Sequence, residues 1–264
     1  MTDLATPTLR HALTVQGRVI HALLMREIIT RFGRENLGVL WLVGEPMIFT
    51  LGVVTLWTVS GMVHHSDMPI VAFGITGYSS VLLWRNAAGR AAGAVEQNRQ
   101  LLYHRTVRVL DTLVTRILVE ILGATGSFVF LVTLFGFLGW VPLPVDLLTV
   151  AGGWLMLSWF GASLALLIGA GTAYSAIVER AWHPTQYLLF PMSGAAFMVD
   201  WLPTKFQTAV LYFPMVHGVE MLRQGYFGNV VRTHYDVTYM AACCLVLTLL
   251  GLALTRQVAQ RVEF

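Results

Sequence analysis

Charged residues are scarce in this chain. Asp, Glu, Lys and Arg together make up 12% of its 264 residues, whereas hydrophobic residues make up 56%. Because an average soluble domain is about 25% charged, the composition excludes that class and predicts an integral membrane protein. Backbone amides in hydrocarbon need partners within their own segment, and apolar runs without polar alternation favour helices over a closed barrel. We therefore predict an all-α, polytopic membrane protein.

Lysine and cysteine are scarcer still. Lys205 is the single lysine beside 16 arginines, so a phosphate-binding loop of the form Gly-x-x-x-x-Gly-Lys-Ser/Thr is excluded. If the protein uses ATP, another chain binds it. The eight histidines show no metal-ligand spacing, and the adjacent Cys243 and Cys244 would form only a strained disulfide. We expect no cofactor, metal site or catalytic residue in this chain, and no binding to nucleic acid.

Long apolar runs are present instead, and they predict six transmembrane helices. The first run, 37–62, is long enough at ~1.5 Å per residue to cross a ~30 Å hydrocarbon core. The second, 68–84, is expected to continue as a helix to residue 95, with Arg85 and Arg90 turned away from lipid. The third, fourth and last spans are predicted at 117–140, 147–177 and 239–255.

The fifth crossing is predicted to be broken. Run 187–201 contains Pro191, and the next apolar run, 209–219, contains Pro214. Neither piece is long enough to cross a bilayer comfortably alone. We therefore expect one broken span and short re-entrant helices before the last span, where protein or a water-filled cavity covers the freed backbone groups.

The segment before the first span is predicted to be an amphipathic helix at the membrane surface. Met25 and Ile29 lie on its apolar arc, and Glu27, Arg31 and Arg34 lie opposite, as expected of a helix in the plane of the interface.

The distribution of basic residues predicts the orientation. Twelve lysines and arginines fall on the side of the two termini and three on the other side, which places both termini in the cytoplasm. We predict a single domain over 1–264, made of a cytoplasmic or interfacial helix at 1–36, a six-span bundle at 37–255 and a cytoplasmic tail at 256–264.

Charges within the predicted spans form the first candidate site. An unpaired arginine near the bilayer centre costs at least ~2.5 kcal/mol, so Arg85 and Arg90 face a cavity, a partner or the interface. They are either anchors that snorkel toward headgroups or a positive lining for an anionic substrate. Glu45, beside Pro46, either caps a kink or faces a conduit.

Aromatic residues recur inside the spans and at their ends, among them Tyr78, Trp84 and Tyr187. Interfacial belts and lipid-facing packing are one interpretation. The other is a passage for a polysaccharide, because aromatic faces stack on sugar rings.

The loop 98–108 contains Leu101, Leu102 and Tyr103 in polar surroundings. It is either a solvated basic loop held by headgroups or a short helix whose apolar knob fits a cytosolic partner. We favour the second interpretation, because burying three such residues requires a partner surface.

Two motifs resemble a known family. Residues 26–46, Arg-Glu-Ile-Ile-Thr-Arg-Phe-Gly-Arg-Glu-Asn-Leu-Gly-Val-Leu-Trp-Leu-Val-Gly-Glu-Pro, resemble the N-terminal part of membrane permeases in ABC exporters for bacterial cell-surface polysaccharides. Residues 214–223, Pro-Met-Val-His-Gly-Val-Glu-Met-Leu-Arg, are similar to that family's Pro-x-x-His-x-x-Glu-x-x-Arg element. The resemblance covers nearly the whole chain and is closest to the capsule-export branch, the KpsM type.

This resemblance implies a permease subunit that exports a lipid-linked acidic polysaccharide across the bacterial inner membrane. It implies a homodimer with a channel between the protomers and two copies of a separate cytoplasmic ABC ATPase, which bind ATP and Mg. Periplasmic and outer-membrane polysaccharide export proteins are further expected partners.

The resemblance also implies roles for individual residues. The substrate path would include Glu45, Tyr78, Trp84, Arg85, Arg90 and Tyr187. The ATPase stroke would be received by Arg26, Arg31, Arg34, Asn98, Leu101, Leu102 and Tyr103. The periplasmic gate would be built from Pro191, Pro203, Phe206, Phe213 and Pro214, with Glu220 and Arg223 stabilising the return of the chain.

Permeases for O-antigen and teichoic acid share this architecture, and export of a small amphiphile is a further alternative. A membrane-embedded enzyme or scaffold without an ATPase partner is the alternative from another class.

Overall fold

The computed structural model describes residues 9–32, 38–60, 68–102 and 107–262. These parts of the chain are helical and contain no strand, which confirms the all-α prediction. The α-helices are α1 (Leu9–Phe32), α2 (Gly38–Ser60), α3 (Ile70–Ala91), α4 (Ala94–Gln97), α5 (Arg99–Leu102), α6 (Val109–Phe137), α7 (Leu147–Tyr174), α8 (Ala176–Leu189), α9 (Thr204–Val210), α10 (Pro214–Phe227) and α11 (Val237–Val262), and the 3-10 turns are η2 (Val199–Trp201) and η3 (Gly228–Val230).

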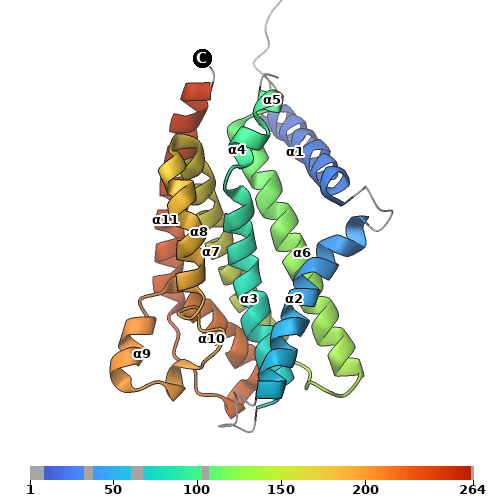
Figure 1. Cartoon of the computed structure of the whole chain (residues 1–264), viewed down its shortest axis with the longest axis vertical. Helices are drawn as coiled ribbons and strands as arrows, with labels where there is room; N and C mark the ends of the chain where they lie inside the picture. Colours follow the sequence, from blue (N-terminus) through green and yellow to red (C-terminus); the bar gives the residue numbers. More distant parts are fainter. Residues whose placement is uncertain (1–8, 33–37, 61–67, 103–106, 263–264) are drawn as a thin grey trace, which may run out of the picture.

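The long helices run side by side along the long axis of the molecule (Figure 1). The end of α11 lies at the upper end of this view together with α4 and α5, whereas α9 and α10 lie at the lower end. Helix α1 crosses obliquely at the upper end and packs against α6 and α2.

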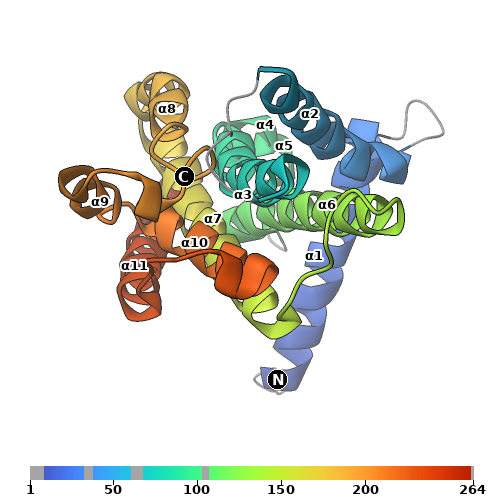
Figure 2. The same ribbon diagram turned by 90° about the horizontal axis from the view of Figure 1, so that it is seen from below.

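Helix α3 is the centre of the packing. It contacts α2, α6, α7 and α10, which surround it in Figure 2. Every residue from Ala72 to Trp84 is buried, including the hydroxyl-bearing Thr76 and Ser80. Their hydroxyls donate to backbone carbonyls one turn earlier, at 2.9 and 2.5 Å. A helix of modest hydropathy is therefore shielded from lipid by its neighbours.

Small residues allow α7 to approach its neighbours closely. A Cβ added at Gly161 would lie 3.0 Å from the Cα of Trp84 on α3, and one at Gly153 would lie 2.6 Å from the amide nitrogen of Leu222 on α10. Such glycine contacts are the usual means of close helix packing in membranes.

Three of the described helical segments are long and apolar enough to cross a membrane: Val109–Phe137, Leu147–Tyr174 and Val237–Arg261. A shorter apolar segment, Val43–Val59, lies within α2. The total of six crossings, the interfacial position of α1 and the re-entrant nature of α9 and α10 stay predictions.

Several predicted helix ends are wrong because polar capping residues, which the apolar runs do not include, set where the helices begin and end. Helix α6 begins at Val109 rather than 117, because the Asp111 carboxylate accepts a hydrogen bond from the Arg108 amide at 2.9 Å and so caps the helix. The short helix favoured for the loop 98–108 corresponds to α5, Arg99–Leu102, and α4 precedes it.

The break between α7 and α8 also differs from the prediction. Ser175 has an extended backbone, with φ −152°, and its hydroxyl accepts from the Ile177 amide at 3.3 Å. Helix α7 therefore ends at Tyr174 rather than 177, and a separate helix, α8, begins at Ala176. Pro214 occupies the first turn of α10, where proline fits a helix.

Candidate functional site

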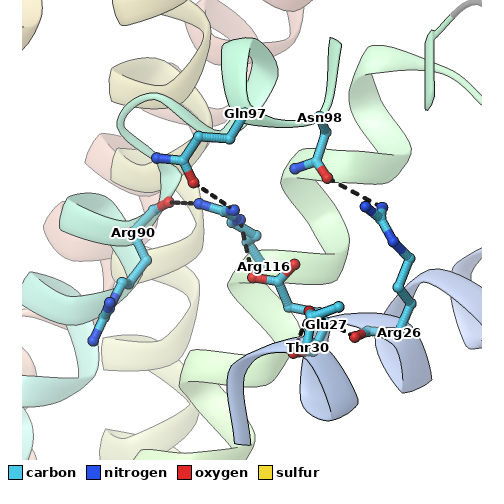
Figure 3. Close-up of a pocket in the computed structure, with 7 residues that line it drawn as sticks. All are labelled: Arg26, Glu27, Thr30, Arg90, Gln97, Asn98 and Arg116. Atoms are coloured by element: carbon cyan, nitrogen blue, oxygen red, sulfur yellow. Dashed lines mark hydrogen bonds and ion pairs between the residues drawn. The ribbon is translucent and has the colours of Figure 1, made fainter. Parts of the chain in front are cut away.

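Two polar clusters lie at opposite ends of the molecule. The first lies around a pocket of about 330 Å³ between α1, α3, α4 and α6, and all its members except Glu45 and Glu120 line this pocket (Figure 3). We call this first cluster the charge network; its members are Arg26, Glu27, Glu45, Arg90, Gln97, Asn98, Arg116 and Glu120.

Arg116 of α6 contacts three other helices. Its Nε lies 3.2 Å from Oε1 of Glu27 on α1. Its Nη1 donates to the carbonyl oxygen of Arg90 in α3 at 3.0 Å, and its Nη2 donates to Oε1 of Gln97 in α4 at 2.8 Å. The guanidinium thereby joins α1 to the ends of α3 and α4.

Arg90 and Glu45, proposed separately for the substrate path, form an ion pair. Arg90 Nη2 lies 3.0 Å from Glu45 Oε1, and its Nε lies 3.9 Å from Oε1 of Glu120 on α6. The Glu120 side chain is only 6% exposed and that of Arg90 is 47% exposed. Two carboxylates therefore share one half-exposed guanidinium, which also ties α2 to α3 and α6.

The residues proposed for ATPase coupling are partly brought together. Arg26 Nη1 lies 3.4 Å from Oδ1 of Asn98, and Asn98 donates to the carbonyl of Ala94 at 2.9 Å. Leu101 and Leu102 are half-buried in α5, and Leu102 packs against the protein's own core. Arg34, Tyr103 and the side chain of Arg31 lie outside the described residues.

Tyr78 and Arg85 lie together where α3 faces α8. The Arg85 guanidinium is 5.9 Å from the centroid of the Tyr78 ring, and its Nη2 is 3.5 Å from the Tyr78 hydroxyl. The Tyr78 ring packs edge-on against Phe190, with centroids 6.0 Å apart. Tyr187 on α8 is 67% exposed. Tyr78 itself is only 6% exposed, so this contact positions Arg85, and the place of Tyr78 in the substrate path stays a prediction.

Trp84 lies elsewhere. Its side chain is fully buried between α3 and α7 and packs edge-on against Phe160, with ring centroids 6.2 Å apart. In this conformation it has no surface to offer a substrate, so its place in the path stays a prediction without support from its position.

The second cluster consists of His217, Glu220 and Arg223, which recur every third residue along α10. We call it the α10 ladder. All three side chains are buried, and that of Arg223 is completely so. Arg223 Nη1 donates to the carbonyls of Gly194 and Phe197, both at 2.7 Å, and its Nη2 donates to the Ala195 carbonyl at 2.6 Å. The guanidinium therefore fixes the path of the segment that follows α8.

Glu220 and His217 hold two further segments. Glu220 accepts hydrogen bonds from the amides of Val199, at 3.2 Å, and His234, at 2.9 Å. His217 Nδ1 accepts from the Asp236 amide at 2.8 Å, so the proton of the neutral ring is on Nε2, which lies 2.8 Å from the Leu211 carbonyl. The ladder thus binds the chain on both sides of α10 through backbone atoms.

The residues proposed for the gate differ in how far their side chains are exposed. Phe206 is 62% exposed on α9, a helix that contacts η2 and has no buried residue. Pro191 and Pro203 are exposed, whereas Phe213 and Pro214 are half-buried at the start of α10.

Five residues of the two clusters were not predicted as site residues from the sequence: Glu27, Gln97, Arg116, Glu120 and His217. Only His217 carried a local signal, through the Pro-x-x-His spacing.

The architecture is that of an all-helical membrane subunit in which short helices at both ends are tied to a long-helix bundle. Residues 18–227 match the ABC-2 type transporter family. The chain belongs to this family, which confirms the resemblance drawn from the two motifs.

Named relatives match almost end to end. The capsule polysaccharide export inner-membrane protein CtrC of Neisseria meningitidis serogroup A is 43% identical over 263 residues, covering 100% of this chain and 99% of CtrC. The corresponding BexB of Haemophilus influenzae is 40% identical over 256 residues, 97% of each chain. The polysialic acid transport protein KpsM of Escherichia coli is 28% identical over 261 residues, 94% of this chain and 96% of KpsM.

Proposed function

We propose that this chain is the permease subunit of an ATP-driven exporter that moves a lipid-linked acidic capsular polysaccharide across the bacterial inner membrane. The observation that carries the proposal is the end-to-end similarity to capsule polysaccharide export inner-membrane proteins, at 43% and 40% identity. A match to the ABC-2 type transporter family alone would identify the class of transporter but not its substrate.

The energy source lies on another chain. Since the sequence contains no lysine-bearing phosphate loop, ATP and Mg bind to a separate cytoplasmic ATPase, two copies of which serve a homodimer of permeases. Helices α1, α4 and α5 form the surface that meets this ATPase. The polar pocket supports this assignment, because its lining residues join α1 and α4 to the bundle.

Six crossings are formed by α2, α3, α6, α7, α8 with the segment after it, and α11, with both termini in the cytoplasm. The excess of arginine in the segments flanking α1, α4, α5 and the end of α11 supports this orientation. Those helices lie at one end of the molecule in Figure 1.

The polysaccharide passes between the two protomers, along the face where the half-buried Arg85 and the exposed Tyr187 lie. A cation beside aromatic rings suits an acidic sugar chain. The segment around α9 and α10 closes the passage on the periplasmic side, where the export proteins of the periplasm and outer membrane take over.

The test is complementation in a capsulated bacterium whose own permease gene is deleted. The wild-type chain is expected to restore surface capsule and to co-purify with a stoichiometric ATPase, whereas Arg85→Ala is expected to assemble but export less. Arg180→Gln, an exposed arginine on α8, is the control.

Three results would count against the proposal. Absence of a co-purifying ATPase would favour the enzyme or scaffold alternative. Restored O-antigen or teichoic acid without capsule would reassign the polymer. Stimulation of the ATPase by a small amphiphile in a polymer-deficient strain would favour small-molecule export.

A further inference from the structure

Helices α3 and α4 are separated by a sharp turn rather than a continuous helix. Gly93 has φ +72°, a left-handed conformation that favours glycine, and its amide donates to Thr172 of α7 at 3.1 Å. Two residues, Ala92 and Gly93, link α3 to α4 along the chain, and α4 also packs against α6 and α7. A force applied to α4 acts on this turn, so a contact that spans the turn resists its bending.

Arg116 spans this turn. Its Nη1 holds the Arg90 carbonyl in the last turn of α3, where the helix itself supplies no amide partner. Its Nη2 holds Gln97, the last residue of α4. The two contacts lie on opposite sides of Gly93, so the guanidinium fixes the distance across it.

The third contact of Arg116 extends the same connection to α1. Its Nε faces Glu27, and the neighbouring Arg26 reaches Asn98, which follows α4. The side chains of Arg116 and Glu27 are only 14% and 20% exposed, so solvent screens their attraction less than at an open surface. A planar guanidinium with five N–H groups can serve three partners in fixed directions, which a lysine ammonium cannot.

The pocket itself is not a strong candidate for an anion site. The arginines of the charge network, Arg26, Arg90 and Arg116, are matched by three carboxylates, those of Glu27, Glu45 and Glu120. The arrangement favours internal cohesion over capture of an external phosphate.

We propose that Arg116 is a strut that makes α1, α3 and α4 move as one body, and so is a positioning residue through which the ATPase stroke reaches the bundle. This role rests on the proposed function, since it presupposes an ATPase beneath α1 and α4. Arg116 acts through the helices it joins and does not touch the substrate.

The experiment compares ATP consumption with transport in the complex reconstituted with its ATPase. Arg116→Gln is expected to keep the ATPase bound and hydrolysing while polysaccharide exported per ATP falls about tenfold, within the usual range of energetic coupling between sites. Arg116→Lys should give an intermediate ratio of export to hydrolysis, because lysine keeps the positive charge near Glu27 but lacks the two Nη groups that contact Arg90 and Gln97. Arg256→Gln, an exposed arginine near the same end on α11, should match the wild type.

A wild-type ratio of export to hydrolysis in Arg116→Gln would overturn the strut. If that variant fails to accumulate, Gln97→Ala replaces it, since this substitution removes one contact from an exposed residue. A lowered ratio there supports the proposal, and a wild-type ratio overturns it.

A second measurement separates failure of the strut from failure of the proposed function. Spin labels at Thr14 on α1 and Glu96 on α4, both exposed, in a chain with Cys243 and Cys244 replaced by serine, report whether these helices move together when ATP binds. Their distance should stay constant in the wild type and change in Arg116→Gln, whatever the substrate. Identical behaviour would overturn the strut, whereas ATP hydrolysis without polysaccharide movement in the wild type would overturn only capsule export.

Discussion

Arg116 and Arg223 each contact three oxygen atoms, but these oxygens differ in kind. Arg116 contacts two side chains and one carbonyl and keeps 14% of its side chain exposed. Arg223 contacts three carbonyls and is fully buried. Contacts between charged side chains respond to salt and to substitution of either partner, whereas contacts to carbonyls fix the path of the chain whatever its side chains.

The contacts of Arg116 and Arg223 give the two ends of the molecule different mechanical properties. The charge network near α1 and α4 is suited to transmit or release a load, because its contacts are polar, partly solvated and adjustable. The α10 ladder is suited to hold one shape, because its donors and acceptors would be left unsatisfied in a buried site if the segment moved away.

The largest effect is expected from Arg223→Gln. A glutamine amide cannot reach all the carbonyls of Gly194, Ala195 and Phe197, and a single buried acceptor left without a donor costs about 1–3 kcal/mol. We expect a loss of about 3 kcal/mol in the free energy of unfolding, measured by denaturant titration of the purified protein in detergent.

Arg232→Gln is the matched control, because this arginine is exposed near the same end, and its stability should equal that of the wild type. An Arg223→Gln variant as stable as this control would show that the ladder does not hold the segment after α8.

Gly77→Ala should have the next largest effect. A Cβ at this position of α3 would meet the Ala195 carbonyl oxygen and would lie 2.6 Å from Arg223 Nη2. Since inserting an atom into a packed site typically costs about 1–3 kcal/mol, we expect a loss of about 2 kcal/mol by the same titration.

Gly52→Ala distinguishes this clash from the effect of a methyl group on a helix. Gly52 lies in α2 with nothing within 4 Å of an added Cβ, so alanine should be neutral or stabilising by up to about 1 kcal/mol. Equal effects of the two substitutions would mean that the Ala195 carbonyl and the Arg223 side chain can move away from an added Cβ at little energetic cost.

Much of the fold was predictable, because apolar runs indicate where the long helices lie and prolines indicate where helices begin or break. The missed helix ends at Val109 and Tyr174 depend on capping by Asp111 and Ser175. In a membrane protein the apolar run draws attention to the bilayer-spanning part of a helix, so a polar extension such as the first turns of α6 is easily assigned to a loop.

The two sites differed in how much the sequence predicted. The family resemblance implied that Glu220 and Arg223 stabilise the return of the chain, but their partners are backbone atoms, which leave no mark in a sequence. Arg116 fell at the edge of a predicted loop, and its partners come from α1, α3 and α4. The pairing of Glu45 with Arg90 likewise depends on how α2 packs against α3, which neither helix reports alone.

The smallest effect is expected from Glu45→Gln in the charge network. Arg90 is half-exposed and retains Glu120 at 3.9 Å, so removing one carboxylate should cost at most about 1 kcal/mol, and less at high salt. Glu220→Gln in the ladder is the comparison, because its amide would place an NH₂ group against the amide of Val199 or His234, which should cost about 1–3 kcal/mol at any salt concentration. Denaturant titrations at low and high salt measure both. If Glu45→Gln proved as costly and as salt-independent as Glu220→Gln, the contrast between an adjustable charge network and a fixed α10 ladder would fail.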